Sequence, residues 1–339
     1  MMQTPKSLIV AELSRTWKRT RYDLFLAAIG YEERSRYIAE AIDVTAESKH
    51  AIGFYEQREQ AYEDNLHWFG SNGYETHIVD DASFRSKVSE AMDSAATQRG
   101  DGTLTVLVDI SSLSRFRLAT IIDLLQGGLP QISLTVHFVY SLAEYNPPSN
   151  ANAQNSHVGP MLRSNFAGWW VEPDRGITAI VGLGYEPDKA LGAVEHLQAA
   201  DIWTFTPRSK ISEYSRALEI ANESLLSTVE RAHQLKYNVH EPFSLFVTLE
   251  SLVYGVMQRQ NPVLLPFGPK LFALCCLLVA CVHRDIAVWR VSAQEQEPAI
   301  NRKASGYVYG LVTIFSPNDM LVTPATVHPE SLQSGTVAS

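Results

Sequence analysis

One candidate site for chemistry is the segment Asp109-Ile-Ser-Ser-Leu-Ser-Arg115, which follows an apolar run. If that run is a strand, it delivers Asp109 to the edge of a sheet. Ser111 and Ser112 then lie where the free backbone N–H groups of a helix begin, and hydroxyls with a nearby arginine such as Arg115 make an anion site there. The alternative is that a serine simply caps the helix.

A second candidate is Pro266-Phe-Gly-Pro-Lys270, which also follows an apolar run and precedes a helical pattern. Gly268 exposes backbone, and Lys270 falls in the first turn of the predicted helix. A cation at a helix N-terminus is electrostatically disfavoured. The position of Lys270 therefore predicts that a negatively charged ligand binds nearby.

A third motif, Gly-Tyr-Glu after an apolar run, occurs twice. The first copy is Gly30-Tyr31-Glu32-Glu33-Arg34, where the tyrosine could stack on a base and the arginine could pair with a phosphate. The alternative is an ordinary turn whose glutamates favour the positive end of a helix. The second copy, Gly184-Tyr185-Glu186, lacks the third glycine of a dinucleotide fingerprint, so NAD binding is not supported.

These motifs recur at nearly constant offsets, which predicts an internal duplication. Gly30 and Gly184 are 154 residues apart, and the apolar runs that begin at Val106 and Val263 are 157 residues apart. We therefore expect an α/β fold made of two tandem Rossmann-like parallel-sheet units related by pseudo-duplication. The expected parts are a first domain at 1–145, a linker or mobile loop at 146–170, a second domain at 171–320 and a disordered tail at 321–339.

The elements that must position these motifs alternate between strands and helices, as parallel sheets require. Ligands in such sheets bind beyond the carboxyl ends of the strands, where these loops fall. The predicted strands are 22–29, 51–55, 75–79, 103–110, 134–140, 177–183, 201–206, 263–265, 286–291 and 307–315. The predicted helices are 34–43, 58–70, 83–96, 113–126, 187–198, 211–231, 243–258 and 270–283.

The composition narrows the classes of function. The chain has 45% hydrophobic residues and a net charge of −9, which indicates a globular protein without broad affinity for duplex DNA. Cys275, Cys276 and Cys281 share one apolar stretch without a CxxC spacing, so we expect buried thiols in a reducing cytoplasm. No signal peptide is visible, and the unbroken apolar part of that stretch, 271–282, is too short to cross a membrane.

The Pro266–Lys270 loop with the following Leu-Phe-Ala-Leu resembles the Gly-Thr-Lys loop that opens the last helix in CARF-type sensor domains. In this chain, Phe267-Gly268-Pro269 stands in place of the usual paired glycines and threonine. The resemblance implies a Rossmann-like fold that binds a cyclic oligoadenylate in a two-fold cleft, in prokaryotic antiviral defence. It carries over Gly268, Lys270 and the loop 109–112, and two such units in one chain would form the cleft internally.

The leading interpretation is a nucleotide-binding protein, a sensor of a nucleotide second messenger, with a small anionic ligand between two similar halves. The expected ligand contacts are Gly30, Tyr31, Arg34, Ser111, Ser112, Arg115, Gly184, Tyr185, Gly268 and Lys270.

Two alternatives stay open. One is an enzyme acting on a nucleotide or phosphoester, with Asp109, Glu32 and Glu186 as candidate acids or bases. No metal-ligand spacing or cofactor motif is visible, so the chemistry would be metal-free or assisted by a loosely held Mg²⁺. The other is a partner subunit or homo-oligomer without a ligand, with the 243–258 helix and Trp169-Trp170 as interface elements.

Overall fold

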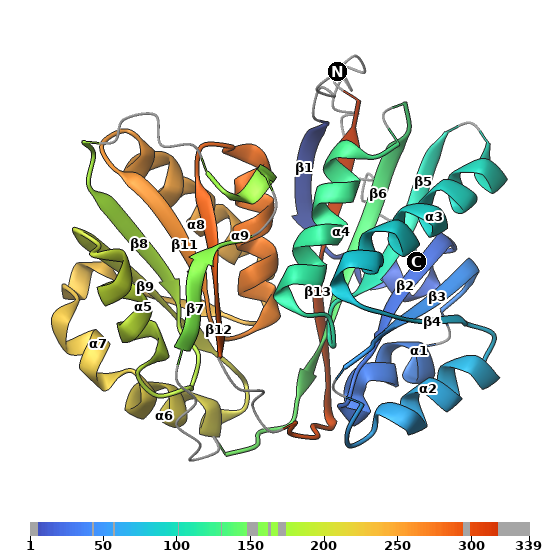
Figure 1. Ribbon diagram of the computed structural model, residues 1–339, viewed down its shortest axis with the longest axis horizontal. Coiled ribbons are helices and arrows are strands. Elements are labelled where there is room, and N and C mark those ends of the chain that lie inside the picture. Colours follow the sequence, from blue (N-terminus) through green and yellow to red (C-terminus); the bar gives the residue numbers. More distant parts are fainter. Residues whose placement is uncertain are drawn as a thin grey trace, which may run out of the picture.

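The computed structural model contains two α/β lobes side by side, each built around one mostly parallel sheet (Figure 1). The described residues are 6–42, 44–56, 58–100, 102–129, 131–147, 155–161, 164–168, 174–293 and 299–317. The α/β fold class expected from the sequence is confirmed.

The first sheet has seven strands in the order β1-β13-β6-β5-β2-β3-β4. The five strands from β6 to β4 run parallel, whereas β13 pairs antiparallel with both β6 and β1. The strands are β1 (Ser7–Glu12), β2 (Tyr22–Ile29), β3 (Ala46–Phe54), β4 (Glu75–Val79), β5 (Thr103–Asp109), β6 (Ser133–Ala143) and β13 (Ala304–Ser316).

The second sheet has six strands in the order β10-β9-β8-β11-β12-β7. Its first five strands run parallel, and β7 pairs antiparallel with β12 at the edge. The strands are β7 (Asn155–Pro160), β8 (Ile177–Gly182), β9 (Asp201–Arg208), β10 (Gln234–Asn238), β11 (Asn261–Pro266) and β12 (Ala287–Ala293).

The parallel cores of the two sheets have the same strand order. Numbered within each half, it is 3-2-1-4-5, so β2 corresponds to β8 and β5 corresponds to β11. A duplication would produce this match, but the order also recurs among unrelated Rossmann-like folds. The internal duplication therefore stays a prediction.

Two parts of the expected domain division differ from the structure. The last strand, β13, lies in the first sheet and not in the second domain at 171–320, because it pairs along β6 and β1. The expected linker at 146–170 contains strand β7, which extends the second sheet. The other linker positions beyond 147, apart from 161 and 164–168, lie outside the described residues, as do Trp169, Trp170 and the expected tail at 321–339.

Helices cover both faces of each sheet. On the first sheet, α1 (Tyr37–Ala41) and α2 (Tyr62–Ser71) cover the outer face, and α3 (Asp81–Arg99) and α4 (Arg115–Gly127) cover the inner face. On the second, α5 (Lys189–Leu197), α6 (Ser212–Ala221) and α7 (Glu223–Thr228) are outer, and α8 (Pro242–Met257) and α9 (Lys270–Val282) are inner.

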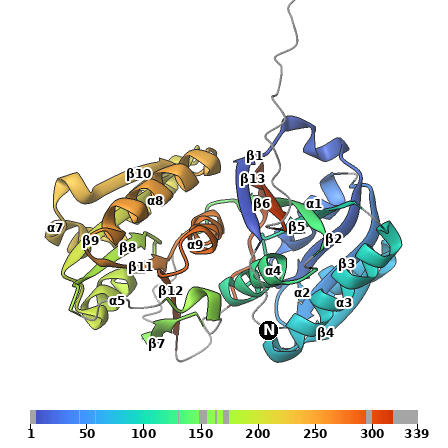
Figure 2. The same cartoon turned by 90° about the horizontal axis from the view of Figure 1, so that it is seen from above.

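The two lobes meet through their inner helices, α4 and α9, which lie side by side between the sheets (Figure 2). A single hydrophobic core runs across this contact and includes Leu118 and Ile122 of α4 and Leu274 and Leu278 of α9. Burial of such a continuous apolar surface resembles a domain core more than a mobile domain interface. One continuous core therefore supports the loops at the carboxyl edges of both sheets.

Helix α9 is buried over almost its whole length, which explains its uninterrupted apolar sequence. Its three cysteines are free, buried thiols, as the sequence predicts, and burial raises the pKa of Cys281 to about 12. Helix α8 packs Leu245, Leu249 and Val253 into the core and exposes Tyr254. Within the described part of the chain, no helix combines the length and apolar character that a membrane crossing demands.

Candidate functional site

The sequence motifs lie at the two points where the strand order reverses. The loops after β2 and β5 leave neighbouring strands in opposite directions, and so do the loops after β8 and β11. Such switch points are where open α/β sheets bind ligands. A Cβ atom added to Gly30 would lie 2.7 Å from Ser112 Cβ, and one added to Gly184 would lie 2.9 Å from Gly268 N. The two loops therefore touch each other within each half.

The two switch points also contact each other across the lobes. Lys270, the first residue of α9, donates from Nζ to the carbonyl oxygen of Ser111 at 2.6 Å. Arg115, the first residue of α4, donates from NH2 to the carbonyl oxygen of Gly268 at 3.0 Å. In each half, the basic residue that begins the inner helix therefore hydrogen-bonds to the loop of the other half.

The close approach of the loop before α9 to the loop after β8 requires a glycine at position 268. Its φ is +67°, and a Cβ atom there would lie only 2.2 Å from the carbonyl oxygen of Leu183. A left-handed backbone without a side chain lets the α9 loop approach the β8 loop, and only glycine allows both. The loop in turn sets the position of Lys270.

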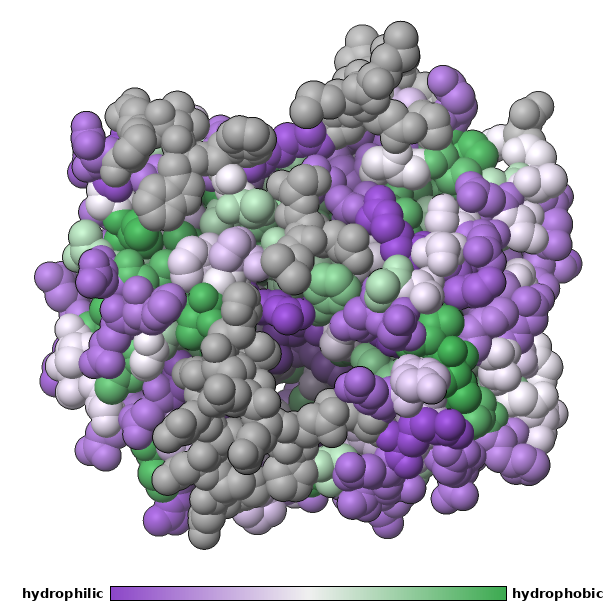
Figure 3. Space-filling view, viewed as in Figure 1, coloured by the Kyte–Doolittle hydropathy of each residue, from purple (hydrophilic) through white to green (hydrophobic). Residues whose placement is uncertain are grey.

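A cavity of about 540 Å³ lies between the two sets of loops. Its walls come from both lobes, and hydrophilic residues gather at the hollow between them (Figure 3). Residues from the sequence motifs that line it are Tyr31, Glu32, Arg34, Arg115, Gly184, Tyr185, Glu186, Gly268 and Lys270. A volume in this range suits a small organic ligand.

A second cavity of about 640 Å³ adjoins the first on the side of the first sheet. Tyr31, Glu32, Arg115 and Lys270 line both cavities, whereas Gly30 and Ser112 line only the second. Together the two cavities collect most of the predicted contacts in one place.

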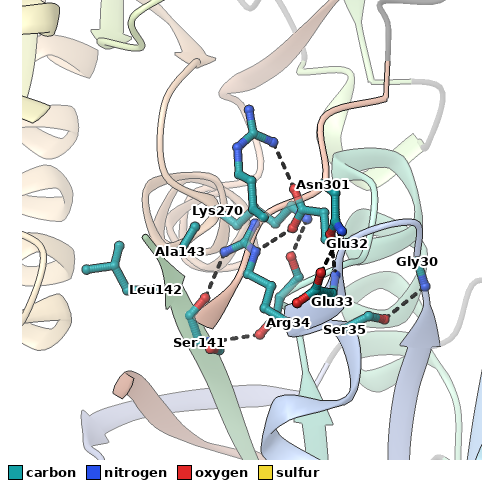
Figure 4. Close-up of polar contacts among 12 residues, drawn as sticks. Gly30, Glu32, Glu33, Arg34, Ser35, Ser141, Leu142, Ala143, Lys270 and Asn301 are labelled. Atoms are coloured by element: carbon teal, nitrogen blue, oxygen red, sulfur yellow. Dashed lines mark hydrogen bonds and ion pairs between the residues drawn. The ribbon is translucent and has the colours of Figure 1, made fainter. Parts of the chain in front are cut away.

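Glu32 is the centre of a buried charge cluster in the cavity wall (Figure 4). Arg34 donates to one carboxylate oxygen and Arg302 to the other, the second at 2.8 Å. Burial alone would raise the pKa of Glu32, but Arg34, Lys270 and Arg302 together hold that pKa below its ordinary value. Glu32 therefore stays ionised and fixes the two arginines.

Arg34 is held on its other side by strand β6. Its NH1 donates to the carbonyl oxygen of Ser141 at 2.7 Å and to the hydroxyl of Tyr140 at 3.3 Å. The sequence predicts that Arg34 pairs with a phosphate. In the structure, Arg34 pairs with Glu32 and β6 while still lining the cavity, so its clearest role is to order the wall.

The segment just before β13 completes the wall and is not among the site residues predicted from the sequence. Asn301 accepts from Glu33 N at 2.8 Å and donates to the Glu33 carboxylate at 2.8 Å, and Arg34 N donates to the carbonyl oxygen of Arg302 at 3.1 Å. The polar run Asn301-Arg302-Lys303 reads only as a turn in the sequence. It reaches the site because β13 returns to the first sheet.

Tyrosine rings form another part of the cavity wall. The ring of Tyr185 lies 5.9 Å from that of Tyr214, and Tyr214 meets the Tyr145 ring edge-on at 5.1 Å. Tyr31, Tyr140, Tyr185 and Tyr214 line the cavity. Aromatic faces of this kind suit planar ligands such as nucleobases. The sequence motifs identified Tyr31 and Tyr185 but not the other two.

The cavity is positive although the chain is negative. Five basic side chains (Arg34, Arg115, Lys189, Lys270, Arg302) and three acidic ones (Glu32, Glu59, Glu186) line it, a difference of two positive charges when Lys270 is protonated, against a net charge of −9 for the chain. Such local focusing of charge favours an anionic ligand.

Four buried polar atoms in the two cavity walls have no hydrogen-bond partner among the described residues: Ser112 Oγ, Arg115 Nε, Arg290 Nε and Arg302 Nε. Buried polar groups are almost always paired in folded proteins. An acceptor such as a phosphate oxygen could satisfy these donors after a small movement of the wall, because the atoms are closed off from solvent.

Lys270 is partly exposed at this site, and its ammonium has an unusual environment. Burial, followed by repulsion from Arg34, lowers the pKa of Lys270 to about 7, although Glu32 and Asp109 favour the charged form. The amine is thus near its titration point at neutral pH. An anion bound beside it would raise its pKa and hold the proton.

Asp109 and Ser111 lie behind the wall and line neither cavity. Ser111 N donates to the Asp109 carboxylate at 2.8 Å, and the Ser111 hydroxyl accepts from Ser141 N at 2.8 Å. Burial raises the pKa of Asp109 to about 6 despite the hydrogen bonds from Ser111. These two residues hold the carbonyl that receives Lys270, rather than contacting the cavity themselves.

No protein-family model matches this chain, and no curated protein sequence matches it. The geometry of the site is therefore the basis for a proposed function.

Proposed function

We propose that the protein binds an anionic nucleotide in the cavity between its two lobes and acts as a sensor of a nucleotide second messenger. The observation that carries the proposal is the convergence of both switch points on one cavity, through the reciprocal contacts of Arg115 and Lys270. A ligand there would touch both lobes at once.

The chemistry of the wall supports a nucleotide. The excess of cationic side chains and the unpaired donors suit phosphate oxygens, which bind Arg and Lys by charge-assisted hydrogen bonds. The tyrosines suit bases, which stack on aromatic rings without regard to sequence. The combination favours a nucleotide over a simple inorganic anion or an apolar metabolite.

The resemblance of the Pro266–Lys270 loop to CARF-type sensors supports a cyclic oligoadenylate as the first ligand to test, and with it a role in prokaryotic antiviral defence. Two similar lobes around one cavity would suit a ligand with repeated phosphate and base groups. A change in how Arg115 and Lys270 bridge the lobes would then report binding to the rest of the protein.

The direct experiment is to release whatever co-purifies with the folded protein and identify it by mass spectrometry. A thermal-shift screen of mono-, di- and cyclic nucleotides should accompany it. We expect a nucleotide that raises the unfolding temperature of the wild type. A folded protein that neither retains nor responds to any nucleotide would refute the proposal.

A second candidate, hydrolysis of a bound nucleotide or phosphoester, has one observation in its favour: Glu186 is a carboxylate in the cavity wall. Glu32 is held by two arginines and Asp109 lies behind the wall, so neither is well placed as an acid or base. Turnover of a bound nucleotide that is lost in Glu186→Gln, with binding retained, would favour an enzyme. Binding without turnover would favour a sensor.

A further inference from the structure

A group of metal-ligand residues lies on the first sheet, away from the cavity. His50 of β3 pairs with Glu75, the first residue of β4, and His77 follows on the same face of β4. One ligand atom from each of the three residues lies within 4.8 Å of the other two. Glu75 Oε2 is 3.7 Å from His50 Nδ1 and 3.9 Å from His77 Nε2.

These distances are close to those of a metal site. Tetrahedral zinc bonds of about 2.0–2.1 Å place neighbouring ligand atoms roughly 3.3 Å apart. The Glu75 side chain is 69% exposed and can move to close the remaining gap, while the strands fix the two histidines. The imidazole ring centroids lie 5.8 Å apart with an interplanar angle of 15°, so at least one ring must turn for the in-plane lone pairs of both to meet at one ion.

The hydrogen bonding of His50 favours metal binding at the correct nitrogen. His50 Nε2 is 2.8 Å from Ser48 Oγ, on the same face of β3. When Nε2 donates its proton to that hydroxyl, Nδ1 keeps its lone pair directed toward Glu75. Metal-bound histidines commonly have such a partner on the other nitrogen, which fixes the ring and its tautomer.

We propose that His50, Glu75 and His77 bind a divalent transition-metal ion, with Zn²⁺ as the preferred cation and solvent in the fourth position. Two imidazoles with one carboxylate suit zinc, whereas Mg²⁺ and Ca²⁺ prefer oxygen ligands only. The sequence spacing does not reveal this site because the parallel pairing of β3 with β4 creates it.

The site would clamp the edge of the first sheet. Strand β4 is the terminal strand in the order, at the outer side of its lobe in Figure 1. Glu75 lies at the amino end of β4, whereas the nucleotide cavity lies beyond the carboxyl ends of the strands. The metal would therefore hold β4 on β3 and stabilise an edge strand without taking part in ligand binding.

The test is metal binding by the metal-free full-length protein, measured by calorimetry and by the absorption spectrum of Co²⁺ as a zinc surrogate. We expect one Zn²⁺ per chain and a rise of about 3–5 °C in the unfolding temperature at a hundredfold excess over Kd. Chelator should reverse the rise and Mg²⁺ should not produce it. The Co²⁺ spectrum should show the visible bands of a four-coordinate site.

Matched variants separate this site from other histidines. His77→Gln and Glu75→Gln, both at partly or fully exposed positions, should lower zinc affinity at least tenfold and abolish the Co²⁺ bands while the protein still folds. His67→Gln, at an exposed histidine of α2, should change neither. Absence of stoichiometric Zn²⁺ binding, or unchanged binding in His77→Gln and Glu75→Gln, would overturn the proposal and leave an ordinary His–Glu contact.

Discussion

Arg115 and Lys270 occupy equivalent positions, as the first residues of α4 and α9, and each donates a hydrogen bond to a backbone carbonyl oxygen of the opposite half. The two acceptors are neutral carbonyl oxygens, so these bonds leave the positive charges at the cavity. Both contacts lie at the start of the helices whose packing joins the lobes. The site thus adjoins the interface between the lobes. Substitutions at the site should therefore affect stability as well as binding.

The tight approach of the α9 loop to the β8 loop should depend on Gly268. Alanine there would meet the Leu183 carbonyl at 2.2 Å in a left-handed backbone, so we expect Gly268→Ala to lower the free energy of unfolding by at least about 2 kcal/mol. Gly255→Ala is the matched control, because Gly255 lies in helix α8 with open space around it. It should be neutral or stabilise by about 0.5–1 kcal/mol. Urea denaturation of both variants measures these free energies. Equal changes in Gly268→Ala and Gly255→Ala would contradict the close packing at Gly268.

The buried carboxylate of Glu32 should contribute far more to the free energy of unfolding than an exposed carboxylate does. Glu32→Gln would leave Arg34 and Arg302 without their charged partner, and we expect a loss of about 2–3 kcal/mol in the free energy of unfolding at pH 7. Glu63→Gln, which breaks the exposed pair with Arg58, should change it by less than about 0.5 kcal/mol.

The Glu32 effect should also depend on pH in one direction. Its pKa is lower in the folded protein than in the unfolded chain, so its contribution is present above about pH 4 and is lost as the pH falls through the folded pKa. Denaturation of wild type and Glu32→Gln across pH 3–7 measures this. A stability difference that grows toward acid pH would be inconsistent with the ion pairs.

Nucleotide affinity should fall as the pH rises, since the pKa of Lys270 is about 7 in the free protein and only the ammonium form attracts an anion. We expect the loss of affinity to approach about tenfold per pH unit above this value. A cyclic nucleotide is the right probe because its phosphodiester does not titrate in this range. In Lys270→Arg the guanidinium stays charged, so affinity should be nearly flat from pH 6 to 8.5. If affinity falls equally steeply with pH in wild type and Lys270→Arg, a group other than Lys270 is responsible for the pH dependence.

The elements that the sequence predicted best are those buried on both faces. In β2, Leu24 and Leu26 face the inner core while Phe25 and Ala27 face the outer one, so the strand reads as a continuous apolar run. The predicted bounds 22–29 match the structure, and β5 and β8 agree to within one residue. The sequence therefore places the loops that follow these strands correctly, at the carboxyl edge of each sheet.

The elements that the sequence missed are short or lie at sheet edges. Strands β7 and β10 carry weak apolar patterns, and β1 is a short apolar run at the edge of its sheet. The helix expected at 211–231 is two helices followed by a short turn. No local pattern tells which sheet β13 joins, since pairing with β6 and β1 is a long-range choice. Arg302, Tyr140 and Tyr214 were missed as site residues because long-range folding alone brings them to the cavity.

A nucleotide site between the lobes is tested by equilibrium binding of mono-, di- and cyclic nucleotides, including cyclic oligoadenylates, to wild type, Lys270→Met and Lys236→Met. Lys236 is an exposed residue of β10 and serves as the charge-matched control. We expect one class of nucleotide to bind the wild type and the control equally, and Lys270→Met about 10–150-fold more weakly, the range for a lost hydrogen bond to a charged group. Equal affinity in Lys270→Met, or no binding by the folded wild type, would contradict a nucleotide site between the lobes.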